Sequence, residues 1–231
     1  MKTALITTIY FIFLNLSSIY LSQAQFIAQE EIKGFTTASD VIILRDYSET
    51  KGLIELGEAY SKARGVTIFS AMNALNSRAK KKLLEEASAR GASHVWITER
   101  LPDDAGMFGR LVSYNAVFYR KPENKIDISQ VKKKITETPF KNSVTFYTDR
   151  NNFGAKTKYF IGPVWTILNT EVEIFEKNNR VYIQKKVIKA ARNISEIKTY
   201  EVIGIGKEKM LLSLELEKDK KYGAHLFEPM K

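Results

Sequence analysis

The segment AMNALNSRAKKKLLEEASARGASHVWIT, residues 71–98, decides how the first half of this chain folds. Its apolar residues recur at helical spacing and form one stripe, which consists of Met72, Leu75, Ala79, Leu83 and Ala87. Gly91 follows as a C-cap, because glycine adopts a left-handed conformation without a Cβ penalty. Residues 95–98 are an apolar run typical of a buried strand. The segment therefore predicts a helix over 71–90 that leads into a core strand.

Strands are predicted on both sides of this helix. Upstream, residues 41–44 form a short β-branched run, and residues 53–60 show alternation. Downstream, residues 111–120 place Val112, Tyr114, Ala116 and Phe118 on one face. We therefore expect residues 25–122 to form an antiparallel-leaning α+β module, with one main helix across a small sheet.

The chain after Pro122 is predicted to be rich in strands. Proline lacks a backbone donor and often ends a strand, so we place the module boundary there. A short helix is expected over 128–135, capped by Asp127, and a hairpin turn at Asn178-Asn179. Strands are expected at 143–148, 159–161, 164–168, 171–176, 180–189, 199–205, 210–216 and 222–227. Residues 123–231 are thus expected to form an antiparallel barrel or sandwich, and the fold class is α+β.

The N-terminus has the pattern of a secretory signal peptide. Lys2 precedes an apolar run from Ala4 to Leu21, and small residues follow at Ser22-Gln23-Ala24. We expect cleavage after Ala24, and a retained anchor is the alternative, although polar residues interrupt the run. The mature protein is then periplasmic or secreted and has no stable membrane span. It contains no cysteine, which excludes disulfides, so core burial must stabilise it.

The first module resembles a known kind of bacterial envelope domain. The resemblance rests on Leu56-Gly57-Glu58, the Ala- and Lys-rich helix 79–90, the turn 91–95 (Gly-Ala-Ser-His-Val) and the aromatic strand 114–119. Residues 41–122 are in this respect similar to RcsF- and YbjQ-like domains, which implies a compact α+β module in the bacterial envelope. RcsF-type sensors depend on disulfides and a lipid anchor, and a chain without cysteine can form neither.

Catalytic and metal-binding patterns are weak. His94 and His225 are far apart in the sequence, and we interpret both as structural residues. Ser-x-x-Lys recurs by chance in this lysine-rich chain, for example at Ser48, Ser77 and Ser195, without the companion motifs of penicillin-binding proteins. The adjacent carboxylates at 85–86 are best explained as a solvated helix face, and a carboxylate-dependent hydrolase remains a minor alternative. We therefore expect no enzyme activity, no cofactor and no metal.

Two regions are candidates for partner binding. The segment from Pro102 to Arg110 combines Asp103, Asp104, Met107, Phe108 and Arg110, and an apolar pair between charges is typical of a contact surface. Asp103-Asp104 after a proline also fits a turn, and Met107 and Phe108 could instead fold back onto the sheet. The formal net charge is +10, with most of the excess in the second half, including Lys132-Lys133-Lys134. These lysines could attract an anionic polymer or lipid head group.

The function expected from these features is binding. We expect an exported, non-enzymatic envelope protein that binds another envelope protein or an anionic surface polymer or lipid, and export argues against nucleic acid. The alternative is a carrier of a small apolar ligand, held in a lipocalin-like barrel around Phe160, Trp165, Phe175 and Tyr182. The oligomeric state is left open.

Overall fold

The computed structural model describes residues 32–65, 70–104, 109–149, 156–159, 166–167, 171–189, 194–218 and 220–230. The expected signal peptide lies outside these residues. The described residues belong to one compact unit that contains two sheets. In this described part of the chain, no helix is both long enough and apolar enough to span a bilayer.

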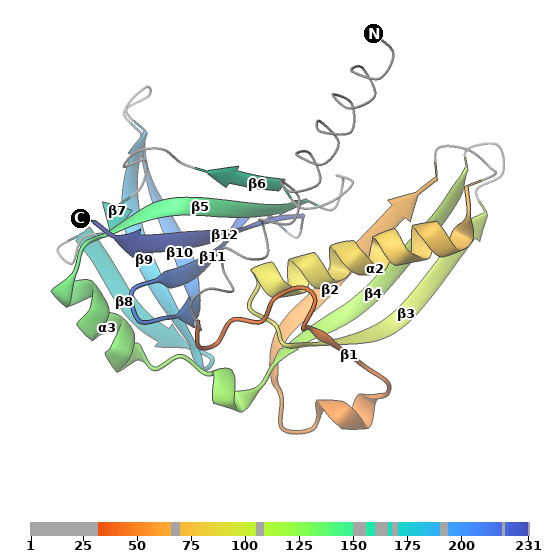
Figure 1. Ribbon diagram of the computed structural model, residues 1–231, viewed down its shortest axis with the longest axis horizontal. Coiled ribbons are helices and arrows are strands. Elements are labelled where there is room, and N and C mark those ends of the chain that lie inside the picture. The colour runs from red at the N-terminus through yellow and green to blue at the C-terminus, as the bar shows by residue number, and fades with distance from the viewer. Residues whose placement is uncertain are drawn as a thin grey trace, which may run out of the picture. The chain divides into compact units, whose positions relative to one another are not determined.

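The first sheet, called here the N-terminal sheet, has the strand order β1-β3-β4-β2 (Figure 1). Its strands are β1 (Ile42–Leu44), β2 (Ile54–Arg64), β3 (His94–Asp104) and β4 (Arg110–Arg120). Strand β1 pairs in parallel with β3, whereas the other pairs are antiparallel. A short 3-10 helix, η1 (Tyr47–Thr50), connects β1 to β2. Helix α2 (Met72–Ala89) covers one face of this sheet (Figure 1).

The predicted apolar stripe is the buried face of α2. Leu75, Ala79, Leu83 and Ala87 pack in one core with Val95 and with the predicted face of β4, which confirms both assignments. The helix ends as expected at Gly91, whose φ is 71° and whose N–H donates to the Ser88 carbonyl at 2.9 Å. A Cβ at Gly91 would also lie only 2.8 Å from Cβ of Ile203, so both conformation and close approach require glycine there.

The second half begins with η3 (Pro122–Asn124) and α3 (Ile128–Glu137), and Asp127 caps α3 by accepting from Ser129 N–H, as predicted. The strands that follow are β5 (Phe140–Asp149), β6 (Lys156–Tyr159), β7 (Thr166–Ile167), β8 (Val172–Lys177), β9 (Arg180–Lys189), β10 (Ile194–Ile205), β11 (Met210–Glu217) and β12 (Lys221–Pro229). They form one antiparallel sheet in the order β6-β5-β12-β11-β10-β9-β8, with β7 paired to β5.

This second sheet, called here the barrel sheet, curls into a nearly closed barrel (Figure 1). Lys185 on β9 donates to the Thr166 carbonyl on β7, which brings the β8–β9 end of the sheet back toward β5. Val131 and Ile135 of α3 pack in a core with residues of β9, β10 and β11. The α+β class is therefore confirmed, and the β-rich module is a barrel rather than a sandwich.

The structure corrects two local predictions, the end of β3 and the start of β10. Strand β3 continues to Asp104, where the sequence predicted a strand that ends at residue 98 and a turn at Asp103-Asp104. It continues because residues 99–104 pair with β4 in a long hairpin, and this pairing outweighs the turn preference of the two aspartates. The layer leans antiparallel as expected, because β1–β3 is the one parallel pair in the described part of this sheet. Strand β10 begins at Ile194 rather than at residue 199, because it pairs with the full length of β9.

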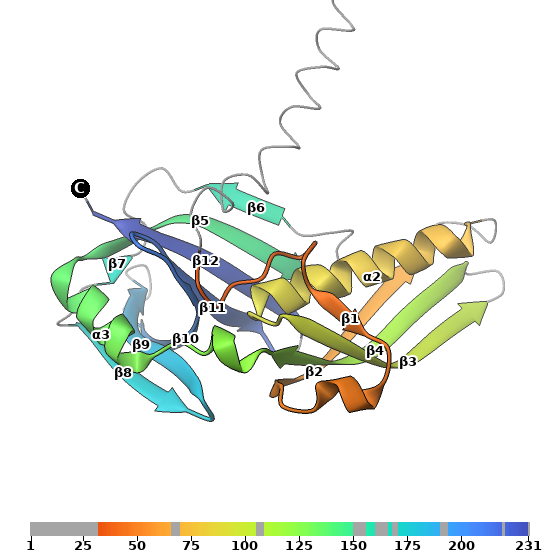
Figure 2. The same cartoon turned by 60° about the horizontal axis from the view of Figure 1, so that its bottom comes forward.

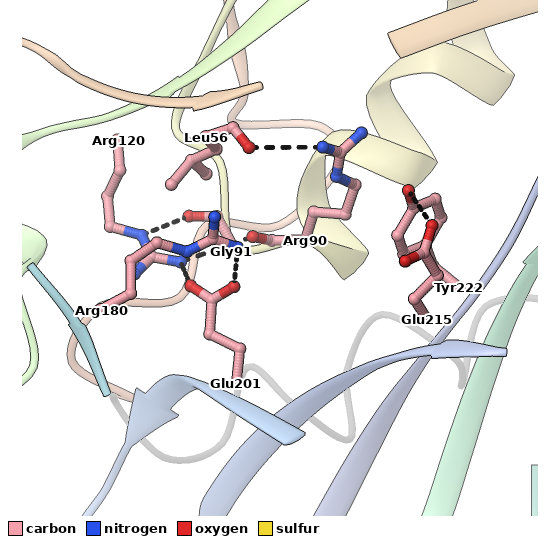
Figure 3. Close-up of polar contacts among 8 residues, drawn as sticks. All are labelled: Leu56, Arg90, Gly91, Arg120, Arg180, Glu201, Glu215 and Tyr222. Carbon is pink, nitrogen blue, oxygen red and sulfur yellow. Dashed lines mark hydrogen bonds and ion pairs between the residues drawn. The ribbon is translucent and has the colours of Figure 1, made fainter. Parts of the chain in front are cut away.

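A buried ionic cluster joins the two sheets (Figure 3). Arg120 at the end of β4 is 2% exposed, and its Nη2 lies 2.9 Å from one carboxylate oxygen of Glu201 on β10. Arg180 on β9 binds the other oxygen of Glu201, and Arg120 Nε donates to the Gly91 carbonyl at 2.9 Å. Burial lowers the pKa of Arg180, but the bond and charge of Glu201 outweigh this and raise that pKa. One carboxylate therefore neutralises charge from both sheets.

Helix α2 also contacts the barrel sheet, through β5 and β12 (Figure 2). The guanidinium of Arg90, just after α2, lies 4.9 Å from the ring centroid of Phe118 in the N-terminal sheet. It lies 4.8 Å from the ring centroid of Tyr222 on β12. Such stacking of a guanidinium on aromatic rings is favourable when partly desolvated. The two sheets therefore share a packed interface around the C-terminal half of α2.

Candidate functional sites

The structure describes only part of the predicted contact segment 102–110. Met107 and Phe108 lie outside the described residues, so the choice between a contact surface and packing on the sheet stays a prediction. Asp103 and Asp104 are the last residues of β3, and their backbones pair with Leu111 and Arg110 of β4. The Arg110 side chain is half-buried and donates to the Ser70 carbonyl at 3.3 Å. The structure thus places Asp103, Asp104 and Arg110 at one end of the β3–β4 hairpin.

A more extended candidate is the face of the N-terminal sheet opposite α2. Ala59, Val95 and Ala116 point into the core beneath α2, so their strand neighbours point the other way. We call this side the open face, and it carries Ile42, Glu58, Tyr60, Trp96, Thr98, Leu101, Asn115 and Val117. Figure 2 shows no helix across this face apart from η1 near β1. Lys62, Glu99 and Ser113 also lie on this side, so the face mixes polar side chains with apolar and aromatic ones.

Apolar side chains are exposed on this face. Ile42 is 49% exposed and Leu101 is 45% exposed. Tyr47 of η1, 64% exposed, lies over the edge of the face with its ring centroid 4.8 Å from that of Trp96. Tyrosine and tryptophan are the residue types that contribute most to binding energy at protein interfaces. The composition of the open face is therefore that of a contact surface.

The open face also contains a hollow of about 500 Å³. Its lining includes Glu58, Tyr60, Thr98, Asn115 and Val117. A register shift between Ile97 and Glu99 in β3 lies beside it, and such bulges re-aim side chains. The Asn115 amide donates to the Glu99 carboxylate at 2.8 Å, which holds a carboxylate near the rim. The hollow therefore combines a tyrosine and an aliphatic wall with acidic and amide groups.

The edges of the N-terminal sheet are protected, unlike its face. Strand β2 is an edge strand, and side chains of α2 donate to its carbonyl oxygens: Arg78 to Arg64 at 2.8 Å and Lys82 to Lys62 at 3.1 Å. Arg90 donates to the Glu58 carbonyl at 2.9 Å. Backbone groups on an unprotected edge would pair with strands of other chains. The N-terminal sheet is therefore better suited to contact a partner through its face than through the β2 edge.

The lysine run lies on the exposed side of α3. Lys132 and Lys133 are exposed and Lys134 is half-buried. Lys133 and Lys134 line a second hollow, of about 290 Å³, which also includes Lys33 and the turn at residues 205–206. The predicted lysine-rich surface is therefore present. It also includes Lys33, which no pattern in the sequence associated with the lysine run.

A polar cluster inside the barrel sheet surrounds His225. Its Nδ1 lies 2.8 Å from Thr145 Oγ1 and 3.1 Å from the Asn142 amide nitrogen. An amide nitrogen only donates, so Nδ1 accepts and the ring proton is on Nε2. The ring meets Tyr147 and Tyr200 edge-on, at centroid distances of 6.4 and 5.8 Å. Burial, and next the charge of Lys198, lowers the pKa of His225 to about 4, so the ring is neutral near pH 7.

His225 is therefore a buried ring packed among polar and aromatic neighbours, which fits the structural role that the sequence suggested. A Cβ at Gly223 would lie 2.9 Å from Nε2 of His225, so the ring occupies the space above that glycine. His94 is also buried, with Nδ1 2.9 Å from Ser93 Oγ, and burial, followed by the charge of Lys121, lowers its pKa. Among the residues that the structure describes, no three histidine or carboxylate side chains converge to hold a metal ion.

Of the four residues suggested for an apolar carrier site, the two that the structure describes do not line the barrel interior. Phe160 and Trp165 lie outside the described residues. Phe175 and Tyr182 stack on one another at 5.4 Å. Their strand neighbours Ile174 and Ile183 belong to the barrel core, so Phe175 and Tyr182 lie on the opposite side of the sheet. Placing them inside the barrel was wrong, because strand alternation gives the interior to the isoleucines.

The open face was missed by sequence reasoning, although a signal was present. In β2, β3 and β4, apolar residues occupy both alternating sets of positions, with Tyr60, Trp96 and Val117 opposite the set that faces α2. Two apolar faces in an antiparallel sheet indicate that both are covered. In the part of the chain that the structure describes, α2 covers one face, whereas only the short η1 lies against the other.

No family model matches this chain, and no curated protein or solved structure matches it either, so its site has to be interpreted from its own residues.

Proposed function

We propose that this protein is an exported, non-enzymatic binding protein that docks another protein of the bacterial envelope on the open face of its N-terminal sheet. The observation that carries the proposal is the exposed apolar and aromatic surface made by Ile42, Tyr47, Trp96 and Leu101 beside a hollow of about 500 Å³. Exposed large apolar side chains gathered on one face of a sheet favour an interaction site.

Charge narrows the chemistry of the partner. Glu58 lines the hollow and Glu99 is held beside it by Asn115, whereas the whole chain has a net charge of +10. An acidic rim on a basic protein favours a partner that presents basic or amide groups around an apolar centre. The expected signal peptide and the resemblance of residues 41–122 to envelope domains support a partner outside the cytoplasm.

Site-specific photo-crosslinking in the native cells tests this proposal. A photoreactive amino acid replaces Thr98, which is exposed at the hollow, and Thr199 provides a matched control because it is an exposed threonine on β10. We expect a crosslinked protein from position 98 and none from position 199. The same partner, once purified, should bind the wild-type protein and lose at least about tenfold in affinity with Tyr60→Ala, as for a contact residue at the centre of an interface.

Two results would refute the docking role. One is a crosslinking pattern from position 98 that equals the pattern from position 199. The other is a partner whose affinity is the same for wild type and for Tyr60→Ala, provided that both proteins unfold at the same urea concentration.

A further inference from the structure

The hollow beside α3 is built from three separate segments, and we call it the lysine hollow. It is lined by Lys33, by Gln130, Lys133, Lys134 and Glu137 of α3, and by the turn at residues 205–206. These segments lie far apart in the sequence, so their lysines meet only in the folded protein. A general excess of lysine on the surface does not by itself bring lysines from separate segments into one hollow.

Backbone contacts fix Lys33 in this position. Its N–H donates to the Ile205 carbonyl at 3.0 Å, and the Ile205 N–H donates back to the Lys33 carbonyl at 2.9 Å. The next residue, Gly34, has a φ of 92°, and a Cβ there would lie 3.1 Å from the Asn124 carbonyl oxygen. The chain can therefore approach the barrel sheet closely enough to bring Lys33 beside α3.

Lys134 is also held in place, whereas Lys133 remains adaptable. The Lys134 ammonium donates to the Lys207 carbonyl and lies 5.8 Å from the ring centroid of Phe140. Lys133 lies 3.8 Å from Glu137, but both side chains are more than half exposed, at 76% and 60%. Exposed pairs of this kind contribute little and exchange readily. Lys133 can therefore leave Glu137 for a stronger anion at little cost.

The charges of the lysine hollow favour an anion. Three lysines line it and Glu137 is the one carboxylate among these lining residues, while Lys132 and Lys207 are exposed nearby and Glu208 is exposed on the same turn. Lysine binds phosphate groups as a mobile point charge with three donors. A volume of about 290 Å³ accommodates one or two such groups rather than a large ligand.

We propose that the lysine hollow binds the phosphate groups of an anionic polymer. A membrane surface is less suitable, because interfacial binding requires exposed apolar side chains beside the basic ones. The exposed large apolar residues in the described part of the chain are Ile42, Tyr47, Leu101, Ile197 and Met230, and none belongs to α3 or to residues 205–209. The protein would then hold a partner protein on one sheet and a phosphate polymer on the other.

The test measures binding of inorganic polyphosphate to the full exported chain. In the double variant Lys33→Gln with Lys133→Gln, both lysines are exposed, so the fold should be retained. The matched control, Lys51→Gln with Lys186→Gln, removes the same charge at two other exposed positions. We expect the hollow variant to lose at least about tenfold in affinity and its salt dependence to fall by about two ions released, while the control changes by less than about threefold.

Three outcomes would overturn the proposal. The first is that the wild type does not bind polyphosphate. The second is that the hollow and control variants lose the same amount of affinity for polyphosphate. The third is that the protein binds vesicles of phosphatidylglycerol and phosphatidylcholine but not polyphosphate. The last result would instead identify a membrane surface as the ligand. Tyr60→Ala should bind polyphosphate like the wild type, so failure of this proposal and failure of the open-face proposal can be distinguished.

Discussion

Replacing His225 by asparagine should reduce the acid sensitivity of the fold. His225 is 1% exposed, and its pKa is lowered from 6.5 to about 4. Between these pH values the unfolded chain binds a proton that the folded protein does not bind, so the free energy of unfolding falls as the pH falls. For this one group, the loss relative to pH 7 is about 2 kcal/mol at pH 5 and about 3 kcal/mol at pH 4.

Asparagine is suited to this test because its side-chain oxygen can replace Nδ1 as the acceptor for Thr145 and Asn142. The variant will be less stable at pH 7, since part of the ring volume becomes a cavity. Urea unfolding at pH 7, 6, 5 and 4 gives the free energy of unfolding of each protein. The difference between wild type and variant should shrink by about 2 kcal/mol from pH 7 to pH 5, because groups that titrate in both proteins cancel.

His94→Asn provides the matched control. His94 is also buried with a lowered pKa, but its cluster is in the N-terminal sheet. If the difference between wild type and His225→Asn does not change with pH, His225 is not neutral in the folded protein. If His94→Asn changes the pH dependence more than His225→Asn does, the polar cluster in the barrel is not the main acid-sensitive site.

Three further substitutions test the packing. Glu201→Gln leaves the buried Arg120 and the half-buried Arg180 without their counter-charge, so urea unfolding should show a loss of about 3–5 kcal/mol, and a loss below about 1 kcal/mol would contradict the ionic cluster. Gly91→Ala introduces a Cβ at a φ of 71°, and at least about 2 kcal/mol of stability should be lost. Asp127→Ala removes the cap of α3 and should lower the urea midpoint in the same measurement, with Asp127→Asn close to wild type.

Local patterns in the sequence were sufficient for most of the elements. The stripe of α2, the glycine at residue 91, the cap at Asp127 and the hairpin at Asn178-Asn179 each depend on a few neighbouring residues. Both asparagines have a positive φ, of 52° and 59°, as a tight hairpin requires. These features could be predicted because their physical causes are local.

The contacts that matter for function could not be predicted in the same way. The parallel pairing of β1, the meeting of Arg120 with Glu201 and the approach of Lys33 to α3 join residues far apart in the sequence. Charge and hydropathy patterns do not encode which segments become neighbours. The lysine run was visible, but the hollow beside it depends on the three-dimensional path of residues 32–35.

That path would also limit how the protein folds during the export that we propose. A translocated chain emerges N-terminus first, yet Lys33 forms its backbone bonds with Ile205, close to the other end. Such distant contacts form late, because a long loop must close before they are gained. In an exported chain, residues 32–35 would therefore gain these contacts only after nearly the whole polypeptide had crossed the membrane.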